Sequence, residues 1–271
     1  MNRLSSNVML EDMKSMVSDA AVTDDDIQET LAQNIFPDDL STSVEQTDQT
    51  EICSVFTPLH YEPNYAYPLL IWLHGAGENE TCLRQVMPKI SMRNYAAVAP
   101  RGTLPLGQER LPQLSDAFTW PLGDIHTADA MDRVCMAIER AEQRFHVDKN
   151  RIFLAGSGTG GTMALQIGMT IPERFSGILS VGGPLPREDT ILAHLNKSRR
   201  LPLLLTVDRD NHQYPDAMVC EDLRLLHIAG MTVTLRQYPA GDALRDSMLS
   251  DIDQWIMEVI ASEQKAPIVR V

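Results

Sequence analysis

From residue 52 onward, short apolar runs alternate with stretches whose apolar positions recur at helical spacing, a pattern that predicts strands alternating with helices. Helices are predicted at 81–90, 126–145, 160–170, 216–229 and 245–262, and the apolar runs predict strands at Ile52–Phe56, Leu69–Leu73, Tyr95–Ala99, Ile152–Ala155, Gly177–Val181, Leu203–Val207 and Val233–Tyr238. Strands that are nearly continuous in apolar residues and separated by helices are typical of a mostly parallel central sheet with helices on both faces. We therefore expect an α/β fold with its ligand site beyond the carboxyl ends of the strands.

The first 51 residues have a different pattern. Residues 4–36 carry weak helical periodicity, whereas residues 37–51 are polar, have little to bury and predict a linker. The segment 1–51 holds 12 acidic and 2 basic residues, a formal charge of −10; the other 220 residues hold 25 acidic and 21 basic residues, a charge of −4. We predict an acidic N-terminal extension at 1–51, partly helical or flexible, and an α/β domain at 52–271.

The net charge of −14 excludes whole classes of partner. Nucleic acids and anionic membrane surfaces both attract clustered Lys and Arg, which an acidic chain does not supply. The N-terminal residues contain no apolar signal sequence, no window is apolar enough to span a membrane, and the four cysteines form no C-x-x-C pair. We expect a cytoplasmic protein with no nucleic-acid or membrane partner, no metal and no cofactor.

Two glycine-rich loops follow predicted strands. The first is His74-Gly75-Ala76-Gly77-Glu78, where glycine lets backbone N–H groups approach a ligand closely, as an oxyanion hole requires. A tight strand-to-helix turn needs glycine as well, so the loop alone does not decide. The second, residues 156–161 (GSGTGG), lies between a strand and a helix, which is the layout of a nucleophile elbow. That layout puts Gly158 at the apex, where the nucleophile belongs.

These loops carry a resemblance to a known family. The runs LHGAGENE at 73–80, VAPRG at 98–102 and LAGSGTGGTMAL at 154–165, with Phe118-Thr119-Trp120, resemble the phospholipase/carboxylesterase (acyl-protein thioesterase-like) branch of the α/β-hydrolase superfamily. The resemblance covers residues 52–262 and implies the α/β-hydrolase fold. The elbow of that family has the pattern G-F-S-x-G-G, and its catalytic serine falls on Gly158.

The resemblance also places the other two members of the family's catalytic triad, on Asp210 for the acid and on Asp242 for the histidine. Glycine has no oxygen with which to attack a carbonyl, and an ionised aspartate is a poor substitute for an imidazole base. No intact triad is therefore expected at Gly158, Asp210 and Asp242. If the two carboxylates face each other, their repulsion raises one pKa or recruits a cation or an arginine, such as Arg209 or Arg245.

The backbone part of the site is better retained. The resemblance places the oxyanion-hole donors on the N–H groups of Ala76 and Thr159, and a pocket with these donors still binds a carboxylate or an acyl carbonyl. The loop 101–122 is predicted to form one wall, and the segment 183–200 is either a short lid or an ordinary crossover connection. The predicted binding residues are His74, Gly75, Ala76, Gly77, Thr159 and Trp120.

Displaced groups are the alternative route to catalysis. Ser157 precedes the apex by one residue and would need a shifted turn and a new base, and His212 lies close enough to Asp210 in sequence to approach the cleft. His74 is expected to hydrogen-bond backbone within its loop rather than to act as a base. Our interpretation is an esterase-like protein without hydrolytic activity that binds a small acyl or carboxylate ligand, or a protein partner through residues 1–51. The alternatives are a carboxylic-ester hydrolase with an altered catalytic constellation and a structural or oligomer-forming protein.

Overall fold

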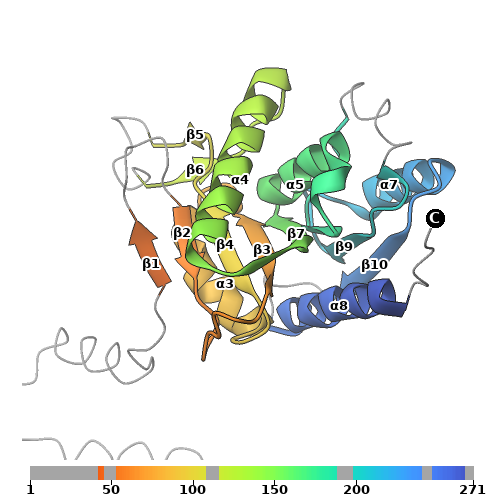
Figure 1. Cartoon of the computed structure of the whole chain (residues 1–271). Coiled ribbons are helices and arrows are strands. Elements are labelled where there is room, and N and C mark those ends of the chain that lie inside the picture. The colour runs from red at the N-terminus through yellow and green to blue at the C-terminus, as the bar shows by residue number, and fades with distance from the viewer. Residues whose placement is uncertain (1–41, 46–52, 108–115, 188–197, 240–245, 266–271) are drawn as a thin grey trace, which may run out of the picture. The chain divides into compact units, whose positions relative to one another are not determined.

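A computed structural model describes residues 42–45, 53–107, 116–187, 198–239 and 246–265 of this protein. Within these residues the main sheet has eight strands in the order β1-β2-β4-β3-β7-β8-β9-β10 (Figure 1). The six strands from β4 to β10 are parallel, whereas β1 and β2 run antiparallel to their neighbours. Parallel strands end at the same edge of the sheet, so the loops that follow β3, β7, β8 and β9 gather there.

The seven strands and five helices predicted from the sequence are confirmed, with shifts of a few residues at their ends. The strands are β2 (Cys53–Phe56), β3 (Tyr67–Leu73), β4 (Ala96–Pro100), β7 (Val147–Ser157), β8 (Gly177–Val181), β9 (Leu203–Asp208) and β10 (Val233–Tyr238). The helices are α3 (Leu83–Ile90), α4 (Asp124–Arg144), α5 (Thr159–Thr170), α7 (Asp216–Ile228) and α8 (Asp246–Lys265), with short 3₁₀ turns at η1 (Glu80–Cys82) and η3 (Pro172–Arg174).

Three strands were not predicted. Within the segment interpreted as a linker, β1 (Thr42–Glu45) pairs with β2 and forms the edge of the sheet, so at these four residues the linker interpretation is wrong. An edge strand pairs on one side only and needs no apolar run, which is why the polar sequence concealed it. The other two strands, β5 (Leu104–Pro105) and β6 (Phe118–Thr119), form a separate two-stranded sheet. The remainder of the predicted extension, residues 1–41 and 46–51, lies outside the described residues.

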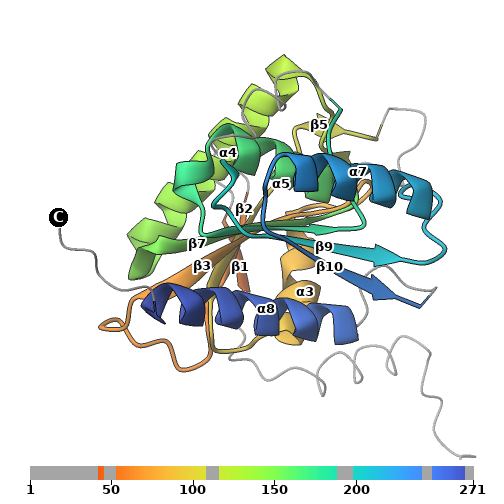
Figure 2. The ribbon, with the colours of Figure 1, turned by 90° about the vertical axis from the view of Figure 1, so that its right-hand side faces the viewer.

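Helices cover both faces of the sheet, as predicted. Figure 2 shows α4, α5 and α7 on one face and α3 with α8 on the other. The layer of α4, α5 and α7 includes a helix that is buried along most of its length. Residues Gly160 to Met169 of α5 are all buried, because α5 packs on β7 and β8 at the centre of the sheet. Gly168 permits this close packing, since a β-carbon there would collide with Ile178 of β8. The end of α5 distant from the candidate site thereby packs closely on β8.

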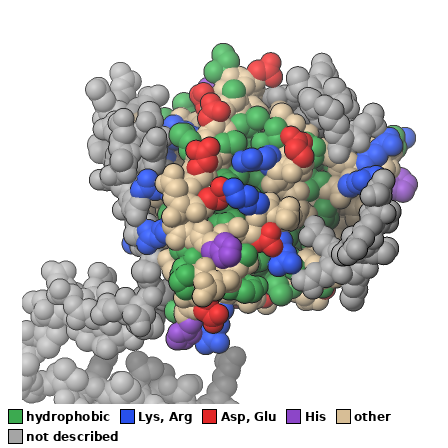
Figure 3. Space-filling view, in the orientation of Figure 1, with side chains coloured by type: hydrophobic (Ala, Val, Ile, Leu, Met, Phe, Trp, Pro, Cys, Tyr) green, Lys and Arg blue, Asp and Glu red, His purple; other side chains and the backbone are tan. Residues whose placement is uncertain are grey.

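Charged side chains of both signs are interspersed on the face seen in Figure 3, with no large area of one sign among the coloured residues. This agrees with a nearly balanced charge for the α/β domain. In the part of the chain that the structure describes, no helix combines the length and apolarity needed to cross a membrane.

Candidate functional site

The strand-to-helix turn at the end of β7 forms the floor of the site. β7 ends at Ser157, α5 begins at Thr159, and Gly158 between them has φ +51° and ψ −119°. The Gly158 N–H donates to the carbonyl of Val181 in β8 at 2.8 Å, which fixes the turn to the neighbouring strand. A β-carbon on Gly158 would meet nothing within 4 Å. The apex of the predicted elbow therefore has room for a side chain and carries none.

The glycines on either side of the apex, Gly156 and Gly160, are required for a different reason, which is close backbone packing. A β-carbon on Gly156 would collide with the carbonyl of Gly160, and one on Gly160 would collide with the carbonyl of Leu73 at the end of β3. The elbow therefore packs directly against the backbone of the first glycine-rich loop. This contact brings together the two loops that the sequence singled out.

Backbone and carboxylate groups hold the first loop in shape. Gly77 N–H donates to the Phe118 carbonyl at 3.0 Å, and Gly75 N–H donates to Glu78 Oε2 at 2.8 Å. Among the described residues the exposed Ala76, between these glycines, has no acceptor for its N–H, and neither has Thr159, the first residue of α5. The two N–H groups predicted as oxyanion-hole donors are therefore free of partners within the described residues.

The start of α5 strengthens this donor site. No side chain caps the helix and no acidic residue lies in its first turn. The first N–H groups of a helix have no partner within it, and the helix dipole adds partial positive charge at the same place. The floor of the site therefore favours an anionic or carbonyl oxygen.

His74 is a buried structural residue. Its Nε2 accepts the Gly102 N–H at 2.9 Å, so Nδ1 carries the proton and donates to the Gly75 carbonyl at 2.8 Å. Burial lowers the pKa of His74 below its ordinary value and favours the neutral ring. The imidazole links the first loop to the backbone after β4, which matches the expectation that it hydrogen-bonds backbone.

Trp120 is likewise a buried residue that supports the first glycine-rich loop. The side chain is buried, its ring lies against that of His74, and its Nε1 donates to the His74 carbonyl at 3.1 Å. None of the six predicted binding residues lines the pocket above Gly158: they are His74, Gly75, Ala76, Gly77, Thr159 and Trp120. Thr159 makes a similar link, because its Oγ1 lies 3.2 Å from Oγ1 of Thr119 in β6. Both contacts connect the loop predicted as a wall to the donor groups.

A buried ion pair that the sequence analysis did not predict connects the first glycine-rich loop to the loop after β4. Arg101 donates to both carboxylate oxygens of Glu80, at 2.7 Å from Nε and 2.6 Å from Nη2, and Glu80 is fully buried. The guanidinium also lies over the ring of Phe118, 4.7 Å from its centroid. A bidentate pair of this kind sets orientation as well as distance. Its signal was present in the sequence, since Arg101 lies in the VAPRG run and Glu80 ends the first glycine-rich run.

The pocket above the elbow has a volume of about 430 Å³. One end is the floor at Ser157 and Gly158, and the other is the loop after β9, which contributes Asp210 and His212. The structure thus brings two of the predicted triad-equivalent positions, Gly158 and Asp210, to one pocket. Asp242, with Arg245, lies outside the described residues. The full lining is Ser157, Gly158, Val181, Gly182, Asp208, Asp210, Asn211, His212 and Gln213.

Ser157 is a poor replacement nucleophile. The residue is 7% exposed, and its Oγ is shielded from solvent and has no hydrogen-bond partner among the described residues. The hydroxyl lies beside Gly75, 3.3 Å from where a β-carbon on that residue would stand. No base within the described residues hydrogen-bonds it, so nothing activates it.

A second buried carboxylate, also missed in the sequence, joins two segments beside the pocket. Asp222 of α7 is fully buried; its Oδ2 accepts from the Leu185 N–H and the Tyr214 hydroxyl, each at 2.8 Å, and its Oδ1 lies 2.8 Å from Arg187 Nη2. Burial raises the pKa of Asp222 despite these partners. An acid between Val219 and Leu226 on the buried face of α7 was the available signal, because buried acids require partners.

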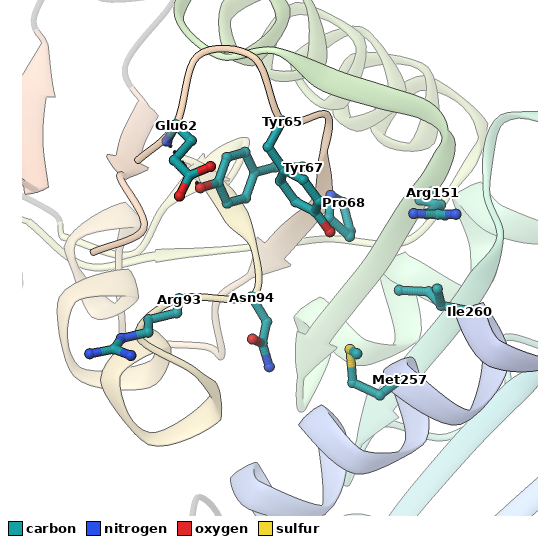
Figure 4. A pocket seen from close by; sticks show the side chains of 9 residues that line it. All are labelled: Glu62, Tyr65, Tyr67, Pro68, Arg93, Asn94, Arg151, Met257 and Ile260. Atoms are coloured by element: carbon teal, nitrogen blue, oxygen red, sulfur yellow. Dashed lines mark hydrogen bonds between the residues drawn. The ribbon is translucent and has the colours of Figure 1, made fainter. Parts of the chain in front are cut away.

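The described residues form a further hollow at the opposite edge of the sheet, where β3 and β4 begin (Figure 4). Figure 4 shows Tyr67 and Met257 on two sides of it and Arg93 directed away. Three of its polar groups already have protein partners: the Tyr67 hydroxyl with the Glu62 N–H, Asn94 with Asp253, and Arg151 with Asp148. It offers fewer free groups than the pocket above Gly158, which we take as the candidate site.

Comparison with known families and structures gives one consistent answer. Residues 62–260 match the phospholipase/carboxylesterase family. A carboxylesterase from Mesorhizobium loti is 18% identical, with 80% of this chain and 98% of that chain covered at a TM-score of 0.62. SOBER1 from Arabidopsis thaliana is 18% identical, with coverages of 72% and 100% at 0.57. A phospholipase/carboxylesterase from Dyadobacter fermentans is 16% identical, with coverages of 79% and 100% at 0.56. These structures are similar in fold.

Proposed function

Since the chain belongs to the phospholipase/carboxylesterase family and has the α/β-hydrolase fold, we propose that it is a member without hydrolytic activity that binds a small acyl or carboxylate ligand. The observation that carries this proposal is the apex of the elbow. Gly158 supplies no nucleophile, while the N–H groups of Ala76 and of Thr159, the residue after the apex, have no acceptor among the described residues. In an active esterase these N–H donors would stabilise the oxyanion formed during hydrolysis. Without a nucleophile no oxyanion forms, and the same donors can bind a carboxylate or carbonyl oxygen of a ligand that does not react.

The first test is hydrolysis. Wild-type protein is assayed with p-nitrophenyl acetate and butyrate against a heat-denatured sample, and we expect equal rates. Saturable hydrolysis by the native protein alone would refute the proposal. A fluorophosphonate probe, which labels reactive serines, tests the alternative of a displaced nucleophile. If the probe labels the wild-type protein and not the Ser157→Ala variant, the Ser157 hydroxyl is active. The buried, unactivated Oγ of Ser157 predicts no labelling.

The second test is binding through the donor at the start of α5. Proline is tolerated at the first position of a helix and has no N–H, so Thr159→Pro removes one donor and keeps the helix. Thr159→Ala is the matched control, since it removes the contact with Thr119 and keeps the N–H. Butyrate binding, followed by calorimetry, should be weakened by Thr159→Pro and unchanged by Thr159→Ala. Equal affinity in all three proteins would contradict a role for this donor.

Restoration provides a third test. The double substitution Gly158→Ser and Asp242→His rebuilds the family's nucleophile and base on a scaffold where the apex has room for the new side chain. Hydrolysis of p-nitrophenyl butyrate by this variant, absent from either single variant, would support a pocket and donors that remain competent. We further propose a cytoplasmic setting, on the basis of four cysteines that form no C-x-x-C pair, and a protein partner for residues 1–51, on the basis of the acidic composition of that segment.

A further inference from the structure

The strand β10 forms one edge of the main sheet. It pairs only with β9, in unbroken parallel register over its 6 residues. Figure 2 looks onto this edge, with α7 on one side of the strand, α8 on the other and no described helix in front of it. The strand at the other edge, β1, has 4 residues and ends in an acid, Glu45. Within the part of the chain that the structure describes, β10 is therefore the longer and less polar of the two edges.

Alternate residues of β10 direct their backbone groups away from the sheet. The carbonyl of Tyr238 faces β9, since it accepts the Arg209 N–H at 3.1 Å. Backbone groups of successive residues in a strand point to opposite sides, so the N–H and C=O groups of Val233, Leu235 and Gln237 point outward. Among the described residues these groups have no backbone partner. The edge therefore offers three N–H donors and three carbonyl acceptors to another strand.

β10 lacks the features that usually prevent an edge strand from pairing with another chain. It contains no Pro, no Lys and no break in register. Its one charged residue, Arg236, faces α8, where it donates to the Asp251 carbonyl and pairs with the carboxylate of the same residue. On the α7 face Leu235 is 38% exposed, and Gln237 donates to Asp216. The edge thus combines outward backbone groups with an exposed apolar side chain and no outward charge.

We propose that β10 pairs antiparallel with β10 of a second copy of this chain, about a two-fold axis at Leu235. An axis at the middle of the three outward residues sets Leu235 opposite its own copy and Val233 opposite Gln237. All the outward groups of both strands then form hydrogen bonds. Apolar side chains meet at the centre, and no like charges lie opposite each other.

This self-complementarity is the reason to expect a second copy. A strand from another protein would offer the same backbone bonds, but only the two-fold arrangement also matches the side chains that β10 itself presents. The pairing does not involve the pocket above Gly158, so it stands apart from the proposed function.

Two opposing effects set the strength of this dimer. A single pair of short strands forms a small interface, of the kind that transient complexes use. Each copy also carries a net charge of −14, and the resulting repulsion is screened by salt. Sedimentation equilibrium of the full chain, from about 1 µM to about 1 mM, should show a monomer–dimer equilibrium that shifts toward the dimer as salt is added. Species that grow beyond two copies would refute a closed two-fold pair.

A charge at the centre of the edge tests the surface. Leu235→Lys sets two ammonium groups opposite each other across the axis, and we expect the dimer to weaken roughly tenfold or more. The control is Ile125→Lys in α4, where the side chain is 77% exposed, because it changes the net charge equally and should not weaken the dimer. A dimer that survives Leu235→Lys, or that both variants weaken equally, would overturn the proposal.

Cysteine cross-linking tests the register. Directly opposite residues in this pairing have Cα atoms about 5.5 Å apart, which suits a disulfide, so Leu235→Cys should form a covalent dimer under mild oxidation. The control is Gln237→Cys on the same face, about 14 Å along the strands from its own copy, which should not cross-link. The wild-type protein gives the background from the exposed Cys220.

Equal cross-linking of the two cysteine variants would refute the axis at Leu235. If the wild-type protein is monomeric at every concentration and Leu235→Cys gives no more cross-linked dimer than the wild type, β10 does not pair with itself. The proposed function would be unaffected by either outcome, because it is tested by hydrolysis and ligand binding.

Discussion

At the scale of single residues, the elbow contains glycines with two different roles. Gly156 and Gly160 are required by close backbone packing, because any β-carbon there meets a carbonyl group. Gly158 is required only by its backbone conformation, since φ +51° strains other residues but no atom occupies the adjacent space. The family's serine tolerates a strained apex in return for an exposed hydroxyl. Glycine at this position removes both the strain and the nucleophile.

This distinction predicts different costs for alanine at the two kinds of position. Gly158→Ala should lower the free energy of unfolding by about 1–3 kcal/mol, the usual cost of a strained φ/ψ. Gly160→Ala should cost more, because the backbone of β3 must move away from the new β-carbon. Urea unfolding followed by circular dichroism measures both. A larger loss for Gly158→Ala than for Gly160→Ala would contradict the packing around the elbow.

His74 predicts a pH dependence of stability. Burial lowers its pKa in the folded state, so below about pH 6.5 the unfolded chain binds a proton that the folded ring does not. This contribution is complete above the unfolded pKa and is lost as the pH falls toward the folded pKa, at about 1.4 kcal/mol per pH unit. Unfolding at pH 7.0 and 5.5 should show a steeper loss for the wild-type protein than for His74→Gln. Equal losses would mean that His74 titrates normally when folded.

At the scale of elements, buried carboxylates join segments that are far apart in the sequence. The Glu80 carboxylate in η1 accepts hydrogen bonds from Arg101, which lies in the loop after β4. The Asp222 carboxylate in α7 accepts hydrogen bonds from the Leu185 N–H, in the segment after β8, and from the Tyr214 hydroxyl, in the loop after β9. Each pair holds a loop at the carboxyl edge of the sheet, beside the candidate site. Rigid strands alone do not position such loops, so these contacts hold the segments that follow β4, β8 and β9.

Asp222 and its neighbour Glu221 allow a matched test of that statement. Both contact Arg187, but Asp222 is fully buried, whereas Glu221 is 65% exposed. Asp222→Ala should cost about 2–6 kcal/mol, because it leaves the Leu185 N–H and the Tyr214 hydroxyl without their acceptor, at about 1–3 kcal/mol each. Glu221→Ala should cost at most about 1 kcal/mol, the range of exposed ion pairs. Similar losses measured by urea unfolding would rule out a special role for burial at Asp222.

At the scale of the whole molecule, the features predictable from sequence were those with a local cause. The strands Leu69–Leu73 and Gly177–Val181 are almost entirely apolar because they lie at the centre of the sheet, and the elbow needs its glycines wherever it occurs. The partners of Asp222 could not be predicted, since nothing local identifies Leu185 or Tyr214 as its donors. The same applies to β1, whose place depends on pairing with β2 and not on its own apolar content.

The position of β1 sharpens the prediction about the acidic extension. The chain divides into two compact units, residues 1–40 and residues 41–271, and β1 begins at Thr42, inside the second unit. Deletion of residues 1–40 should therefore leave the unfolding free energy of the α/β domain unchanged. Deletion of residues 1–50 also removes β1, so it should destabilise the domain and promote association through the uncovered edge of β2.

Thermal unfolding and light scattering of the two truncated proteins separate these outcomes. The shorter deletion should remain monodisperse with the unfolding midpoint of the full chain, and the longer one should show a lower midpoint with larger particles. An unfolded product from the shorter deletion would mean that residues 1–40 contribute to the core, and the division of the chain would be wrong. Identical behaviour of the two deletions would mean that β1 adds no stability, so that the α/β domain begins at β2 in energetic terms, as the sequence pattern alone predicted.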